Sequence, residues 1–209
     1  DIILSTNLRS KFAIASLIPE EGEKVIIYGK VTTYSPQSKY QITVDKIESE
    51  GEGSLLKKLE ETKRRLEKEG IFDRRYKKKI PFIPEKIGVI TSENGAVIKD
   101  IIHRISDRFP LELIVFPVNV QGKECVKHIS EAIQKINSES SKGNKDFIVD
   151  VIILARGGGS LEDLMPFNEE IMVRAIFNSI IPIISAIGHE TDVTLCDFVS
   201  DLSAPTPTA

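Results

Sequence analysis

The feature that most constrains this fold is a regular alternation of short apolar runs with longer amphipathic segments from residue 80 onward. The apolar runs, which are rich in Ile and Val, lie at 87–91, 113–118, 149–155 and 181–187. Between these runs, apolar positions recur at helical spacing over 96–107, 124–137 and 167–178. This order predicts an α/β fold, in which a parallel sheet is covered by helices on both faces.

The first part of the chain has a different pattern. Residues 25–33 and 40–47 are rich in β-branched and aromatic side chains, which predicts two strands joined by a turn. Two or three strands cannot enclose a core, so we expect residues 1–50 to be part of a small β module. A basic connecting helix and linker is predicted over 51–79, with Gly70 as the helix stop. Residues 80–209 then form the α/β domain.

Composition and charge argue against several classes of protein. The net charge of −3 argues weakly against a general nucleic-acid coat, but residues 57–79 hold eleven Lys or Arg against five Asp or Glu. A solvated amphipathic helix with a basic tail is the simplest interpretation of that segment. No apolar run could span a membrane and the first residues do not resemble a secretory signal, so we expect a cytoplasmic protein. Cys125 and Cys196 form no CxxC pattern and predict neither a zinc site nor a disulfide framework.

Polar residues follow three of the predicted strands. Thr91 and Ser92, two hydroxyl donors, end the first strand, the segment 156–160 follows the third, and 189–192 follow the last. In a parallel sheet, the loops that follow strands lie along one edge, where α/β proteins bind their ligands. We therefore expect these three loops to converge.

Residues Arg156 to Ser160 give the strongest local indication of a binding site. Three glycines, Gly157, Gly158 and Gly159, let the backbone approach a ligand, and a helix start after them would add positive potential. The planar guanidinium of Arg156 can hold a phosphate through two hydrogen bonds. Together with Ser160 they predict an anion cradle, although a flexible glycine turn beside a surface arginine fits the same residues. Neither the Walker pattern nor GxGxxG is present, so no nucleotide cofactor is specifically implied.

The GHETD segment supplies groups that can transfer protons. His189 follows a glycine at a strand end and can exchange protons near neutral pH, while Asp192 can orient it. Thr191 is a candidate N-cap of a following helix that would extend to Leu202, and a capping role alone would also explain Glu190, Thr191 and Asp192. The combination suits phosphoryl chemistry on a polyanion, but a phosphosugar enzyme or a noncatalytic nucleotide-binding module fits the same residue types.

Three long stretches, residues 87–110, 149–170 and 182–209, closely resemble the large subunit of exodeoxyribonuclease VII in content, order and spacing. Residues 20–53 are similar to the end of that family's N-terminal OB-fold. The resemblance implies an ATP-independent exonuclease that degrades single-stranded DNA from both ends into short oligonucleotides, together with several copies of a small subunit. By motif, it places the catalytic residues at Asp100, Arg156, His189 and Asp192.

The resemblance also makes Asp100 a candidate catalytic residue. The residues alone predict that it is an ordinary solvated carboxylate on a helix. The resemblance favours contact of Tyr34, Tyr40 and the basic helix with single-stranded DNA. Phosphate or DNA contacts are expected from the three strand-end loops, at Thr91, Ser92, Gly157, Gly158, Gly159, Ser160 and Thr191. No metal site is assigned, although Asp100, Asp192 and Glu190 are carboxylates that could hold Mg²⁺.

Two features depart from the family pattern. A polar insert at 138–146 is longer than expected, and the first OB strands and the long C-terminal helical region are expected to be missing, which predicts a core fragment. A noncatalytic DNA-binding core that is inactive without those parts is therefore an alternative, as is a small-molecule phosphotransferase.

Overall fold

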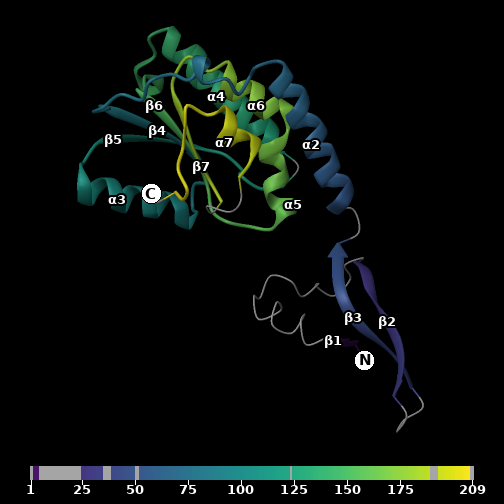
Figure 1. The fold of residues 1–209 in the computed structure, drawn as a ribbon. Helices are drawn as coiled ribbons and strands as arrows, with labels where there is room; N and C mark the ends of the chain where they lie inside the picture. The colour runs from purple at the N-terminus through teal and green to yellow at the C-terminus, as the bar shows by residue number, and fades with distance from the viewer. Residues whose placement is uncertain are drawn as a thin grey trace. The chain divides into compact units, whose positions relative to one another are not determined.

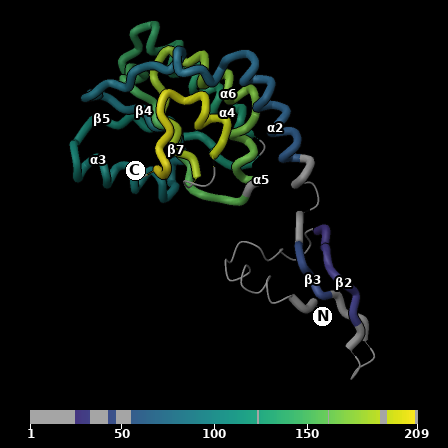
Figure 2. Tube along the Cα trace, viewed as in Figure 1, coloured from purple at the N-terminus to yellow at the C-terminus, as the bar shows by residue number. Residues whose placement is uncertain are grey.

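The computed structural model describes residues 2–4, 25–34, 39–49, 52–122, 124–188 and 193–207. The chain divides into two compact units, Asp1–Lys58 and Leu59–Ala209. Figure 1 labels their helices and strands, and Figure 2 traces the chain through them. None of the helices in these described ranges is long and apolar enough to cross a membrane.

The first unit contains a three-stranded sheet in the order β1-β3-β2. Strand β1 (Ile2–Leu4) is parallel to β3 (Lys39–Ser49), which pairs antiparallel with β2 (Val25–Tyr34). The two strands predicted here are confirmed. The ladder shifts register between Tyr28 and Gly29, where a side chain at 29 would collide with the Thr43 carbonyl. Residues 35–38 of the predicted turn lie outside the described residues.

The second unit is an α/β fold, as predicted. Its five strands are β4 (Lys86–Thr91), β5 (Glu112–Pro117), β6 (Val151–Arg156), β7 (Ile183–Ile187) and β8 (Leu202–Ser203). All neighbouring pairs are parallel, in the order β5-β4-β6-β7-β8. Side chains alternate across this sheet, so Val89 and Ile90 enter different apolar clusters on its two faces.

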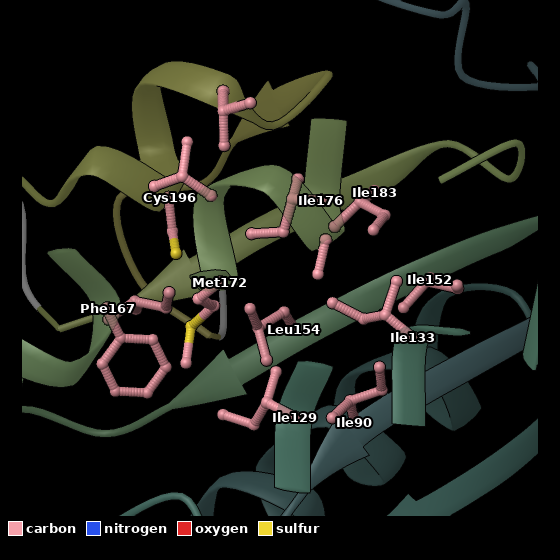
Figure 3. Close-up of a cluster of buried hydrophobic side chains, with 14 of the residues drawn as sticks. Ile90, Ile129, Ile133, Ile152, Leu154, Phe167, Met172, Ile176, Ile183 and Cys196 are labelled. Carbon is pink, nitrogen blue, oxygen red and sulfur yellow. The ribbon is translucent and has the colours of Figure 1, made fainter. Parts of the chain in front are cut away.

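Helices cover both faces (Figure 1). One face packs against α3 (Ala96–Arg108) through Ile98 and Ile101. The opposite face packs against α4 (Cys125–Ser141), α6 (Glu170–Phe177) and α7 (Leu195–Val199). Figure 3 shows how Ile129 and Ile133 of α4 and Met172 and Ile176 of α6 surround Leu154 of β6.

Three predicted helix boundaries are wrong. The last helix has its N-cap at Thr194 rather than Thr191, because Thr194 and Asp197 form a capping box, and it ends at Val199, so Leu202 lies in β8. The helix predicted at 167–178 is preceded by a 3-10 turn, η4 (Met165–Asn168), and α6 begins only at Glu170. Helix α4 continues to Ser141, into the predicted polar loop, before η3 (Lys145–Phe147).

The basic connecting segment forms α2 (Glu52–Lys68) and η2 (Arg74–Tyr76). From Leu59 onward this segment belongs to the second unit, and the Leu66 side chain is fully buried in its core. Several of its charges make internal contacts: Arg65 pairs with Glu170, and Lys77 donates to the carbonyls of Phe198 and Ser200. The positive charge of this segment therefore helps to hold α7 in place.

Asp201 joins three segments of the second unit. Its side chain is 4% exposed, and its carboxylate accepts hydrogen bonds from Lys78 N at 2.6 Å and Ile183 N at 2.8 Å. The Ile183 carbonyl accepts in turn from Asp201 N. These bonds hold the chain after α7 alongside β7, which explains why it forms β8 there instead of continuing the helix.

We predict that Asp201→Ala lowers the free energy of unfolding by about 2–4 kcal/mol, because two partly buried N–H donors lose their acceptor. Urea denaturation followed by circular dichroism measures the change. Asp107→Ala is the control, since Asp107 and its partner His103 are both exposed and their pair contributes about 0–1 kcal/mol. Equal losses for the two variants would contradict this role for Asp201.

The two cysteines are free and buried in the core. Burial raises the pKa of the Cys125 thiol to about 11, although the nearby Arg156 guanidinium acts in the opposite direction. Burial likewise raises the pKa of Cys196 well above its ordinary value. The neutral thiol is therefore the form that the folded state favours.

The contribution of Cys125 to stability should be fully present below the ordinary thiol pKa of 9.0 and be lost as pH rises toward about 11. We expect the wild type to lose about 2 kcal/mol more than Cys125→Ala between pH 8 and 10.5. Urea denaturation at each pH measures both. Parallel pH profiles would show that this thiol does not contribute to the pH dependence.

Candidate active site at the carboxyl edge of the sheet

The order of the strands creates a crevice beside β4. The chain passes from β4 to β5 on one side and then crosses to β6 on the other side of β4. The loops that leave the carboxyl ends of β4 and β6 therefore diverge, and this switch point is where open α/β sheets bind ligands. These loops are residues 92–95 and 157–160, two of the three loops that the sequence places on this edge.

A pocket of about 360 Å³ lies at this point. Its described lining comes from the loops after β4, β5 and β6: Ser92, Gly95, Asn119, Val120, Gln121, Arg156, Gly157 and Gly158. None of these residues carries a carboxylate, whereas an adjoining hollow of about 840 Å³ also contains Glu93 and Glu131. A buried cation surrounded by neutral polar groups suits an anion.

Arg156 is the charged residue of this pocket. It is the last residue of β6 and only 2% exposed, and Gly188 N donates a hydrogen bond to its carbonyl at 3.1 Å. Within the described part of the chain, Nε, Nη1 and Nη2 are buried without a hydrogen-bond partner. Nη2 lies 3.3 Å from Oδ2 of Asp163, an ion pair without hydrogen-bond geometry. Since a buried charge requires partners, the guanidinium can bind a second anion besides Asp163.

The three glycines differ in what they do. Gly157 and Gly158 line the pocket, while Gly159 lies against the ion pair. A Cβ at 159 would be 2.7 Å from Arg156 Nη1, closer still to Nη2, and 2.8 Å from Asp163 Oδ2. A side chain at 159 would therefore force the guanidinium and the carboxylate to move from their positions beside Gly159.

The helix after the glycines differs from the prediction. The segment α5 (Leu161–Leu164) is a single turn with Glu162 and Asp163 in it, so it adds negative charge rather than the expected positive potential. The Ser160 hydroxyl accepts a hydrogen bond from Asp163 N at 3.3 Å. The longer α3 instead directs its N-terminus toward the pocket, since its N-cap, Gly95, is part of the lining and no described side chain caps it.

The remaining sites predicted in the described residues lie apart from this lining. The Thr91 hydroxyl is buried, and its oxygen has no hydrogen-bond partner among the described residues. Asp100 is exposed on α3, as the residues alone predicted, and is not part of the pocket lining. No group of three metal-binding side chains occurs among the described residues. Glu190 and Asp192, two of the three carboxylates named for Mg²⁺, lie outside those residues, so the Mg²⁺ hypothesis stays a prediction and no step is assigned to a metal.

His189, Glu190, Thr191 and Asp192 lie outside the described residues. Their flanks are anchored on both sides: Gly188 by its bond to the Arg156 carbonyl, and Leu195 by a bond from its N–H to Oδ1 of the buried Asn168 at 2.8 Å. The chain therefore enters the GHETD segment directly beside Arg156.

Sequence reasoning missed Asn119 and Gln121. Both side chains are exposed in the loop after β5 and line the pocket. The rule that strand-end loops of a parallel sheet share an edge would have found them, because their loop follows the predicted strand at 113–118. Their amides can donate to an oxygen or accept from a base or sugar.

We predict that Gly159→Ala displaces the Arg156 guanidinium and weakens the binding of inorganic phosphate about tenfold or more. Gly157→Ala is the matched comparison, because among the described residues its Cβ would meet only Val97 Cγ2 at 3.5 Å, an ordinary contact, so it reports the effect of a methyl group in the pocket that does not displace Arg156. Isothermal titration of phosphate compares the two variants. Equal weakening by both would attribute the effect to the glycine-rich turn in general rather than to contact with Arg156.

Comparison with known proteins agrees with the resemblance seen in the sequence. A family model described as "Exonuclease VII, large subunit" matches residues 71–209. Proteins named exodeoxyribonuclease 7 large subunit from Azorhizobium caulinodans and Rhodospirillum centenum are 53% and 55% identical over 96% and 93% of this chain, and 37% of each relative is covered. The one from Ruegeria pomeroyi is 48% identical over the whole chain, which spans 43% of its length. The chain thus belongs to the exonuclease VII large-subunit family.

Proposed function

We propose that this chain is the catalytic core of an exodeoxyribonuclease that hydrolyses single-stranded DNA from both ends into short oligonucleotides without ATP. The observation that carries the proposal is the buried Arg156 guanidinium, which lines a switch-point pocket and has no hydrogen-bond partner among the described residues. Family membership supports the assignment to nuclease chemistry. The chain spans about two fifths of these relatives, so the complete enzyme, with a small subunit, is the proposed active form.

Each group has a distinct task in this proposal. Arg156, Ser92 and the Gly157–Gly158 turn hold the phosphodiester and stabilise the extra negative charge of the transition state, assisted by the α3 N-terminus. His189 and Asp192 position a water or supply a proton to the leaving oxygen, as the resemblance implies. Asp100 is assigned through the resemblance alone. Asn119 and Gln121 are proposed to contact the bound nucleotide.

The N-terminal sheet is proposed to bind the DNA strand as part of an OB-fold. Support comes from Tyr28, which is 49% exposed and has the Lys46 ammonium over its ring, 5.7 Å from the ring centroid. An exposed ring next to a cation can stack on a base while the cation pairs with phosphate. The side chains of Tyr34 and Tyr40 lie outside the described ones. A cytoplasmic location belongs to the same proposal.

The test uses the complete large subunit assembled with its small subunit and single-stranded DNA labelled separately at the 5′ and 3′ ends. We expect short oligonucleotides from both labels, and a loss of about 100-fold or more in Arg156→Lys, which keeps the charge but not the planar fork. Arg104→Lys, at an exposed position of α3, is the control. His189→Ala should also abolish cleavage, and an arm with excess EDTA tests the need for a metal.

The alternatives give different results. Tight binding of single-stranded DNA by the assembled protein without release of oligonucleotides would favour a noncatalytic binding core. Undiminished cleavage by both Arg156→Lys and His189→Ala would remove the proposed site. Stabilisation by a nucleotide with no response to DNA would favour a phosphotransferase.

A further inference from the structure

The two partners of the ion pair between Arg156 and Asp163 differ in their exposure to solvent. Arg156 is 2% exposed, whereas the Asp163 side chain is 46% exposed. Their closest atoms are 3.3 Å apart and form no hydrogen bond. The positive charge is therefore confined to the protein, while the negative charge already has access to water.

The Asp163 carboxylate is held by little else. Among the described residues its oxygens have no other partner, and the hydrogen bond to Ser160 is made by the Asp163 backbone N–H. The structural carboxylate of Asp201 is the opposite case, with 4% exposure and two backbone donors at 2.6 and 2.8 Å. Moving the Asp163 side chain into solvent would break a weak ion pair and no described hydrogen bond.

The geometry also leaves Arg156 open to a second anion. Arg156 lines the pocket and Asp163 does not. Gly159 has no side chain to separate the guanidinium from the carboxylate, so the two meet outside that lining. An arginine fork can hold a phosphate through two hydrogen bonds, which is stronger than the contact it makes with Asp163.

We propose that Asp163 is an exchangeable counter-ion of Arg156, which a phosphate group of the substrate displaces. In the free protein the carboxylate compensates the buried charge, and in the bound state it turns toward solvent while the guanidinium binds the phosphate. When the product leaves, Asp163 competes again for the guanidinium and favours release. This inference rests on the proposed function, because it names the phosphodiester as the group that displaces the carboxylate.

The experiment compares Asp163→Asn and Asp163→Ala with Glu162→Gln in the complete subunit assembly. Glu162 is exposed on the same helical turn, and its side chain makes no ion pair or hydrogen bond among the described residues. Its variant therefore reports the general effect of removing one negative charge nearby. Isothermal titration with inorganic phosphate gives the dissociation constant of each, and cleavage of end-labelled single-stranded DNA gives kcat and KM.

We expect both Asp163 variants to bind phosphate about three- to tenfold more tightly than Glu162→Gln does, with a lower KM for DNA. A residue that merely positions Arg156 would produce the reverse: weaker phosphate binding and a lower kcat. Phosphate affinity equal to or weaker than that of Glu162→Gln would overturn the inference. If the wild-type assembly releases no oligonucleotides, the proposed function fails, and the phosphate titration still decides the role of Asp163.

Discussion

The structure of this site depends on the burial of one positive charge. The Arg156 side chain is withdrawn from water at the end of a central strand, where an uncompensated charge is costly. The surrounding residues fit this constraint: Gly159 has no side chain that would displace the guanidinium, the pocket lining carries no carboxylate among its described residues, and Asp163 approaches from outside it. A site that keeps its cation so poorly hydrated is prepared to bind an anion strongly, since little water has to be removed first.

A second set of polar contacts holds the elements around the site and takes no part in it. Asp201 ties the linker and β7 together, and Asn168 binds the first N–H of α7. Asn137 accepts hydrogen bonds from Ile180 N and Ile181 N just before β7, at the same end of this strand as Asp201. Because Asn137 and Asp201 hold the amino end of β7, and Asn168 holds the chain beyond the loop that follows β7, that loop can carry chemistry without having to stabilise the fold.

Some charges of the basic connecting segment make contacts within the second unit. From its sequence this segment is a solvated helix with a basic tail, which the resemblance turned into a candidate for DNA binding. In the structure, Lys63 lies 4.7 Å above the Phe198 ring, and Lys77 donates to the carbonyls at the end of α7. Such cations pair with aromatic rings and helix ends inside the second unit, so their contribution to stability has to be separated from any contribution to DNA affinity.

The parallel α/β architecture follows from the amino-acid sequence alone, because Ile- and Val-rich runs that alternate with amphipathic helices leave few other ways to bury their apolar faces. The sequence also placed Arg156, Ser92 and two of the glycines on one edge, since strand direction decides where the loops emerge. The tertiary structure fixed what local pattern does not encode: that the strand order opens the pocket beside β4. It likewise decided that Gly159 and Asp163 meet the guanidinium and that Leu202 leaves the helix for β8. Those outcomes depend on contacts between segments far apart in the chain or on close packing around one side chain, and periodicity and motif spacing carry no information about either.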